Sequence, residues 1–500
     1  MATILKLSLT LLIFLSSFNP CKSSNDSTIK LNVEFPSFKN SLKLALSIVQ
    51  KETSTISNLK NLVKDFQSSN ILSDCAKLLE STQEVLDWSL TKFHDPLVKD
   101  FGTGNLKFDL QNWLSSAMTN LATCNEELAA TTFNTIVKEK MAVNLEKVTK
   151  LVNNQLASIQ KIPSMNHGFQ SWFDSHDWKR IQAHEISANI MVALDGSGNL
   201  RSIMAAINSA PSKSSKRFVI HIKNGIYKEY VTIPREKWNI MLVGDGIGRT
   251  IISGDRSHAK GWTTSQSATI VVDGQRFIAV NITFENTAGP NEGQAVALLS
   301  NSDLSVFYHC EIKGYQDTLC PLLNRQFFRE CLISGTVDFI FGDAKVVFQK
   351  CDIRPRQALP GQSNTITAQG HALASNTNGF SFDRCNISGD TDLVSSTNPT
   401  PTYLGRPWRP YSTTVFMQSY MSDIIMPKGW LRWNKSFEST LFYGEYKNYG
   451  PGASTKKRVN WKGFHVLNSS QALQFTVSQF VNGDSWLPST GVPYNGGLVS

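Results

Sequence analysis

A short motif recurs through the second half of this 500-residue chain and constrains its fold more than any other feature. Each copy holds Cys, one variable residue and Ile, and the copies read HCEIKG, ECLISG, KCDIRP and RCNISG, with Cys at 310, 331, 351 and 385. An earlier copy, VNITFEN, has Val280 in the Cys position. Short β-rich segments that recur about every 20 residues predict a right-handed parallel β-helix, whose stacked coils share one core. A β-sandwich is the alternative, although its strands would recur about every 8–12 residues.

Two aspartates occupy the same position in neighbouring copies. Asp317 and Asp338 each lie seven residues after the Cys of their copy. Equal offsets on stacked parallel coils lie one strand spacing apart, about 4.8 Å, so the two carboxyl groups should be neighbours. Such neighbours resist double ionisation, and we expect one to stay protonated near neutral pH, as an acid beside a base or nucleophile. Two surface aspartates in turns are the alternative, but the following residues Phe339, Ile340 and Phe341 are apolar.

The first part of the chain has a different composition and a different period. Of the 31 Gly, only Gly102, Gly104 and Gly168 precede residue 186, and we expect the others to serve the corners of the coils. Residues 25–160 carry apolar side chains in steps of three and four, which predicts four or five amphipathic helices in an up-and-down bundle. Residues 161–185 lack any period and are predicted to link the bundle to the β-helix of residues 186–500.

The extreme N-terminus has the pattern of a secretory signal. Residues 7–15, LSLTLLIFL, form an apolar run behind Lys6, and we assign residues 1–24 to a signal peptide. Secretion permits disulfides, and Cys75 and Cys124 fall on neighbouring predicted helices that they could join. Secretion also permits glycosylation at the N-x-S/T triplets that begin at Asn25, Asn281, Asn386, Asn434 and Asn468. No later apolar run is long enough to span a membrane.

The charge is concentrated in the second part. Residues 186–500 carry 30 Lys and Arg against 22 Asp and Glu, and so hold most of the net charge of +9. This excess suits an anionic partner. The cations are dispersed rather than gathered on one element, which argues against a nucleic acid. The nine His have no metal-ligand or catalytic-triad spacing, so we expect no metal and no cofactor.

Many segments of residues 186–500, in the expected order, resemble plant pectin methylesterases (pectinesterases). The matching segments are DGSG, GIYKE, GDG, GWTTSQSAT, GQAVAL, GYQDTL, GTVDFIFG, TAQG, YLGRPW, GWLRW and GPGAST. Residues 25–160 resemble, by pattern more than by motif, the inhibitor-like pro-domain of the longer family members. The resemblance implies an all-β right-handed parallel β-helix catalytic domain behind an all-α four-helix bundle. It also implies secretion to the cell wall and methyl-esterified homogalacturonan as the substrate.

The resemblance assigns catalytic roles to four residues. Asp338 in DFIFG matches the family nucleophile, which attacks the methyl ester carbonyl of a galacturonate unit to give an acyl intermediate. Asp317 in QDTL matches the acid that protonates the departing methanol and then, as a base, activates water. Gln316 and Gln294 match amide donors that stabilise the negative charge developing on the carbonyl oxygen.

The resemblance also assigns three residues to positioning and substrate binding. Arg406 in LGRPW should pair with Asp338 and keep that carboxyl ionised. Trp408 and Thr264 match positions that contact the sugar chain. For the weaker candidates Tyr315, Phe339 and Trp430, core packing is the preferred interpretation.

Several positions depart from the family pattern. Cys320 places a thiol or disulfide near the cleft, and Asp343 is expected to add negative charge there. Cys331 and Cys351 have stacked registers and could bridge adjacent coils. The Arg-rich processing site expected before the catalytic domain is reduced to Lys179-Arg180, which puts efficient release of the bundle in doubt.

The leading hypothesis is therefore a secreted, monomeric pectin methylesterase, restrained by its own bundle or by a separate inhibitor protein. A β-helix polygalacturonase or pectate lyase is the first alternative, although a lyase would need a calcium site and only the Asp317/Asp338 pair is visible. A non-catalytic pectin-binding or inhibitor protein is the second alternative.

Overall fold

A computed structural model describes residues 36–159, apart from 97, 99, 130 and 132–134, and residues 187–499, apart from 435. The predicted signal peptide and the whole of the predicted linker lie outside the described residues. Within these described residues, four helices come first and pack around a shared apolar core. They are α2 Pro36–Lys60, α3 Phe66–His94, α4 Leu106–Ala129 and α5 Thr135–Ile159. The predicted disulfide between Cys75 and Cys124 joins α3 to α4.

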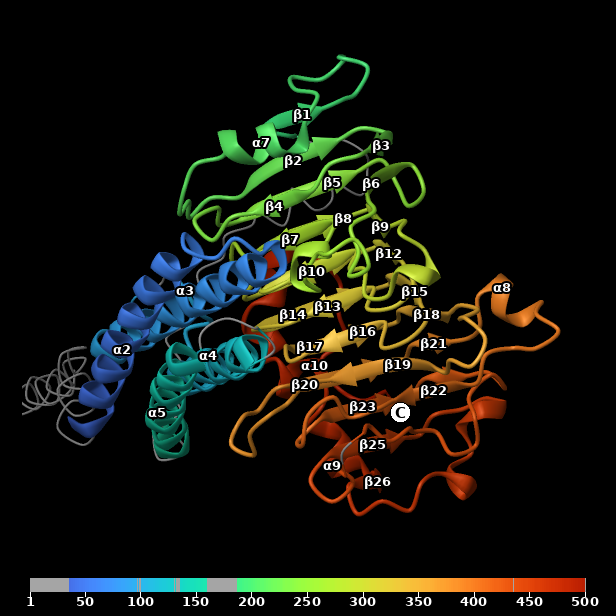
Figure 1. The fold of residues 1–500 in the computed structure, drawn as a ribbon. Helices are drawn as coiled ribbons and strands as arrows, with labels where there is room; N and C mark the ends of the chain where they lie inside the picture. Colours follow the sequence, from blue (N-terminus) through green and yellow to red (C-terminus); the bar gives the residue numbers. More distant parts are fainter. Residues whose placement is uncertain are drawn as a thin grey trace, which may run out of the picture.

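The remainder forms three parallel sheets that wind around one core, so the predicted parallel β-helix is confirmed (Figure 1). The seven-stranded sheet, in spatial order, contains β22 Thr402–Gly405, β19 Asn364–Gln369, β16 Ile340–Gly342, β13 Leu319–Pro321, β10 Leu298–Ser300, β7 Ile270–Val272 and β4 Val231–Ile233. The eight-stranded sheet contains β24 Tyr420–Met421, β21 Asn386–Ile387, β18 Asp352–Pro355, β15 Leu332–Gly335, β12 Glu311–Lys313, β9 Thr283–Asn286, β6 Thr250–Gly254 and β3 Gly225–Tyr227.

The third sheet has eleven strands and carries the C-terminal segment on its outer face. Its strands are β1 Ile190–Val192, β2 Phe218–Ile222, β5 Ile240–Gly244, β8 Ile278–Val280, β11 Ser305–Tyr308, β14 Arg325–Arg329, β17 Lys345–Gln349, β20 Gly379–Asp383, β23 Thr413–Met417, β25 Phe442–Tyr446 and β26 Phe464–Val466. Helix α7 Ile203–Ser209 packs into the core, and α9 Ser469–Leu473 and α10 Val477–Phe480 lie in the C-terminal segment. Trp486 and Leu487 complete the apolar cover of this sheet.

The recurring Ile of the motif forms a column inside the β-helix. Ile312 pairs with Ile333, Ile333 with Ile353, and Ile353 with Ile387. On the eleven-stranded sheet, a column of phenylalanine rings stacks with centroids 4.5–4.9 Å apart. Its members are Phe307, Phe328, Phe348, Phe382 and Phe416. The repeat therefore sets the register of the coils, because each large apolar side chain packs on its equivalent in the next coil.

Two details of the repeat prediction were wrong. Val280 does not occupy the Cys position, because it lies in β8 and pairs with Tyr308, whereas Phe284 pairs with Ile312 and so takes the Ile position. Cys331 and Cys351 do not form a disulfide; both are buried free thiols, as are Cys310, Cys320 and Cys385.

Non-glycine residues make the corner that precedes each Cys. His309, Glu330, Lys350 and Arg384 all have left-handed backbone conformations, with φ between 50° and 54°. The expectation that Gly would serve the corners is therefore wrong for this recurring corner. Left-handed backbone costs a non-Gly residue free energy, and stacking between the coils offsets that cost.

No helix among the described residues is both long and apolar enough to cross a membrane. The bundle lies against the side of the β-helix, with α3 and α4 beside the coils that contain β7 to β17 (Figure 1).

Candidate active site

The residues predicted to act on the substrate line one cavity of about 440 Å³ on the seven-stranded sheet. They are Thr264, Gln294, Gln316, Asp317, Asp338, Arg406 and Trp408. The roof of the cavity comes from the end of α4, through Thr123, Glu126 and Glu127. The bundle therefore covers the cavity that holds the predicted catalytic residues.

The register of β13 and β16 brings the two aspartates together. Leu319 pairs with Ile340, so Asp317 and Asp338 stand at equivalent positions two residues before this pair. Their φ angles are 60° and 52°, in the left-handed region that is costly for a residue with a side chain. The Asp317 amide donates to the Val337 carbonyl at 3.1 Å. Both aspartates are more than nine-tenths buried, so the fold holds two carboxyl groups side by side away from bulk water.

The Asp338 carboxylate is held by two side chains. Arg406 Nε donates to Oδ1 at 2.8 Å, and Arg406 Nη2 donates to Oδ2 at 2.6 Å. The Thr365 hydroxyl also donates to Oδ1 at 2.6 Å, and accepts from the Asp338 backbone amide at 2.9 Å. A bidentate guanidinium pair favours the ionised carboxylate and fixes its plane. The Trp433 ring lies 4.3 Å from the Arg406 guanidinium and supports it.

Asp317 has the opposite environment. Burial raises its pKa well above the ordinary value, and the neighbouring charge of Asp338 raises it further, while Arg406 partly opposes the shift. The site therefore contains one carboxyl paired with a guanidinium and one whose surroundings favour the protonated form.

Two side-chain amides face the same cavity. Gln294 and Gln316 line it, and among the described residues neither amide group has a hydrogen-bond partner. Their backbone carbonyls are used by His258 N and Ala295 N. The amide N–H groups are thus available to a bound group.

The predicted sugar-contact residues lie on the cavity wall. Trp408 packs on Gly370, where a Cβ would lie only 2.5 Å from the indole, and its ring meets Phe341 edge-on at 6.2 Å. Thr264 precedes the short helix η1 Ser265–Ser267. Phe339 and Trp430 are buried in the core. Within the described part of the chain, His, Cys, Asp and Glu do not form any group of three that could hold a metal ion.

Some residues were missed or misplaced by the sequence reasoning. Thr365 and Trp433 were missed, although Thr365 lies just before the TAQG segment, because hydrogen bonding to Asp338 leaves no mark in a pattern. Cys320 lines the cavity as a free thiol. Asp343 does not add charge to the cleft: it is buried under the bundle, where Gln369 and Thr119 donate to it.

A parallel β-helix whose lateral cleft holds two buried carboxyl groups in unequal environments is an arrangement suited to hydrolysis by acid–base or nucleophilic catalysis. The family description "Pectinesterase" matches residues 189–484, and "Plant invertase/pectin methylesterase inhibitor" matches residues 14–157. The chain belongs to the pectinesterase family, whose members remove methyl esters from pectin.

Individual relatives agree with both matches. A pectinesterase/pectinesterase inhibitor of Prunus persica is 49% identical, over 96% of this chain and 94% of its own. Pectinesterase 2 of Citrus sinensis is 44% identical, over 94% of this chain and 90% of its own. The structure of a pectin methylesterase from carrot aligns with a TM-score of 0.62 and 47% identity, over 63% of this chain and 99% of its own. The carrot enzyme lacks a counterpart to more than a third of this chain and still forms the shared fold. That fold therefore does not require the remaining third.

The hydroxyl of Thr365 should position the Asp338 carboxylate. We expect Thr365→Val to lower kcat for ester hydrolysis about tenfold with little change in KM, because one hydrogen bond to a charged group is lost. Methanol release from methylated pectin measures this. Thr367→Val on the same strand is the matched control, because the Thr367 hydroxyl donates to the Leu404 carbonyl instead. Equal losses in the two variants would show that Thr365 acts only on stability.

Proposed function

We propose that this pectin methylesterase uses Asp338 as its nucleophile and Asp317 as its acid and base. The observation that supports these roles is the unequal environment of the pair: Arg406 binds the Asp338 carboxylate through two hydrogen bonds, whereas burial raises the pKa of Asp317. Asp338 Oδ1 accepts two hydrogen bonds and Oδ2 accepts one, so Oδ2 retains more free lone-pair density for attack.

The proposed reaction has two steps. First, Asp338 Oδ2 attacks the ester carbonyl carbon, and the Gln294 and Gln316 amides stabilise the resulting oxyanion. The intermediate collapses, the carbon–methoxy bond breaks, and methanol leaves with the proton of Asp317. Next, ionised Asp317 takes a proton from water as that water attacks the acyl group. This step releases the galacturonate carboxyl group, restores Asp338 and leaves Asp317 protonated again.

The substrate is proposed to be the methyl-esterified homogalacturonan of the plant cell wall, with Trp408 and Thr264 in contact with its sugar units. One matched pectin methylesterase was solved in complex with a hexasaccharide, at 29% identity and a TM-score of 0.50. The basic β-helix suits a polyanionic product. Secretion of a monomeric chain to the cell wall is part of this proposal. The family matches do not favour the polygalacturonase, lyase or non-catalytic alternatives.

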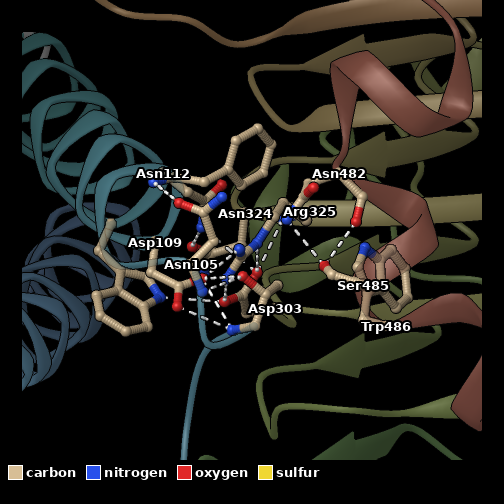
Figure 2. Close-up of polar contacts among 12 residues, drawn as sticks. Asn105, Asp109, Asn112, Asp303, Asn324, Arg325, Asn482, Ser485 and Trp486 are labelled. Carbon is tan, nitrogen blue, oxygen red and sulfur yellow. Dashed lines mark hydrogen bonds and ion pairs between the residues drawn. The ribbon is translucent and has the colours of Figure 1, made fainter. Parts of the chain in front are cut away.

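The bundle is proposed to inhibit the enzyme to which it is joined. A buried ion network anchors it to the β-helix, and Figure 2 shows Asp109 and Asn112 of α4 facing Asp303, Asn324 and Arg325. Arg325 Nη1 contacts Asp109 Oδ1 at 2.6 Å, and Arg325 Nε donates to Asp303 Oδ1 at 2.8 Å. Asn112 Nδ2 donates to Asn324 Oδ1 at 3.0 Å. The side chains of Asp109 and Arg325 are fully buried.

A second contact lies at the mouth of the active-site cavity. Arg409 Nη2 donates to Glu126 Oε2 at 2.7 Å and to the Thr123 hydroxyl at 3.1 Å. Arg409 stacks on Trp408, with its guanidinium 4.2 Å from the ring centroid. These contacts hold the end of α4 across the cleft, so a polymer could not enter while the bundle is docked.

Replacement of the nucleophile tests the proposed chemistry. We expect Asp338→Asn to reduce methanol release from methylated pectin by several orders of magnitude, because an amide cannot form the acyl intermediate. Binding of the substrate should be largely retained. An Asp338→Asn variant that released methanol as fast as the parent would contradict the assignment.

The ion network can be weakened without touching the catalytic residues. Asp109→Asn should increase methanol release by the intact chain toward the rate of residues 186–500 alone, because breaking a buried ion pair costs about 3–5 kcal/mol of docking free energy. Glu146→Gln is the control, since Glu146 pairs with Lys150 on an exposed face of α5. An intact parent as active as residues 186–500 alone would contradict inhibition by the bundle.

Docking should also depend on pH. Burial, as the largest cause, raises the pKa of Glu84 to about 7 and that of Glu127 to about 8, from an ordinary value of 4.5. Docking therefore retains protons on these two carboxyls, so it is strongest below pH 4.5 and weakens as the pH rises toward 7–8. Burial lowers the pKa of Lys345 to about 7. Below pH 7 this lysine is therefore charged whether or not the bundle is docked, so it does not contribute to the pH dependence of docking there. In that pH range the two glutamates determine the effect.

The inhibition constant of the bundle measures this effect. Residues 25–160, which have their own core and disulfide, would be added to residues 186–500 at pH 5 and pH 7. We expect inhibition to be at least about tenfold weaker at pH 7. The variant Glu84→Gln/Glu127→Gln should lose most of this difference, and equal or tighter inhibition at pH 7 by the parent bundle would contradict the prediction.

A further inference from the structure

A second cavity continues from the active site along the β-helix. It encloses about 540 Å³ between α3 and the sheet, and it shares the wall residues Ser265, Leu299 and Leu322 with the active-site cavity. Asp338 precedes β16, whereas the second cavity extends along the seven-stranded sheet to β4, four strands away. At about 4.8 Å per strand this is about 19 Å, so a polymer bound at Asp338 could extend into the second cavity.

An arginine that has no counter-ion in the described part of the chain lines this second cavity. The Arg256 guanidinium lies between two rings, 3.7 Å from the centroid of Tyr230 and 4.0 Å from that of Trp262. Among the described residues it has no ion pair, and no side chain or carbonyl accepts a hydrogen bond from it. The adjacent Asp255 is occupied elsewhere, because it pairs with Lys260 at 2.8 Å and accepts from the Tyr230 hydroxyl at 2.9 Å.

We propose that Arg256, held between Tyr230 and Trp262, is a distal binding site for a free galacturonate carboxylate of the pectin chain. The N–H groups at the edge of the guanidinium match a carboxylate through two parallel hydrogen bonds, and the aromatic rings offer an apolar face to a sugar ring. This inference rests on the proposed function, which makes the substrate a polymer of galacturonate units.

The site would select for the methylation state of the substrate. A methyl ester is neutral and lacks the charge that a guanidinium binds best, whereas a unit that has already been demethylated carries it. Arg256 would thus hold a demethylated stretch of the polymer while a methylated unit lies at Asp338. The enzyme would prefer partly demethylated pectin over fully methylated pectin.

The bundle covers this site as well. Phe66, at the start of α3, meets the Trp262 ring edge-on with centroids 5.5 Å apart. Gln266 Nε2 donates to Asp74 of α3 at 2.8 Å, and the Thr263 hydroxyl also donates to Asp74. Phe66 therefore packs on Trp262, and Asp74 binds Thr263 and Gln266 next to it. Both residues of the bundle lie where the proposal places a galacturonate unit.

Kinetics on two substrates test the proposal with residues 186–500, the part that corresponds to the carrot enzyme. For Arg256→Gln we expect KM for half-demethylated homogalacturonan to rise about tenfold with unchanged kcat, because the contact is made equally in the ground and transition states. KM for fully methylated homogalacturonan should not change. Arg249→Gln is the matched control, since Arg249 is exposed and lines neither cavity.

A binding measurement separates this inference from the proposed function. Calorimetry with a demethylated oligogalacturonate long enough to span both cavities needs no turnover, and Arg256→Gln should weaken its binding about tenfold relative to the parent and to Arg249→Gln. A parent that binds this oligomer but releases no methanol would overturn the proposed function alone. Unchanged binding in Arg256→Gln, or an equal rise in KM for both substrates, would overturn the distal site.

Discussion

The fixed register of stacked parallel coils is the constraint on which the rest of this structure depends. It aligns the Ile and Phe columns that fill the core, and it also places Asp317 over Asp338. Two like carboxyls at one strand spacing would oppose folding if both were ionised. Arg406 and Thr365 donate hydrogen bonds to Asp338, while burial favours the protonated form of Asp317. The same geometry that would destabilise a symmetric pair thus gives the two carboxyls unequal environments, which is what the proposed acid and nucleophile require.

Charged and acidic side chains also attach the helical bundle to the β-helix. Its anchor at Asp109 satisfies a buried Arg325 that would otherwise rely on Asp303 alone, and its acidic residues Glu126 and Asp74 lie along the groove proposed for an acidic polymer. Their carboxyl oxygens accept hydrogen bonds from the β-helix at the places where the proposal puts the oxygen atoms of the polysaccharide. One surface of the β-helix could thus serve both a polysaccharide and a protein.

The sequence predicted the features that repeat and missed some of the contacts that occur once. The Cys-x-Ile spacing predicted both the β-helix and the aspartate pair, because a stack converts sequence offsets into spatial neighbours. Thr365 stands at the position equivalent to Asp338 on the next coil, because Ile340 pairs with Thr367, but it follows Cys351 by 14 residues rather than seven. Trp433 lies outside the repeat, so the period reveals neither residue. Val280 was misassigned by two residues because a β-rich segment does not show where its corner falls. Asp343 was misplaced because neither the Cys-x-Ile repeat nor the helical period shows where the bundle packs on the β-helix.

If the register leaves one carboxyl protonated and the other ionised, infrared difference spectroscopy of the carboxyl groups can tell the two apart. At pH 7 the parent minus Asp317→Asn spectrum should contain the carbonyl band of a protonated carboxylic acid. The parent minus Asp338→Asn spectrum should instead contain carboxylate bands. Carboxylate bands lost with Asp317, or a protonated band lost with Asp338, would show that the protons are not distributed in this way.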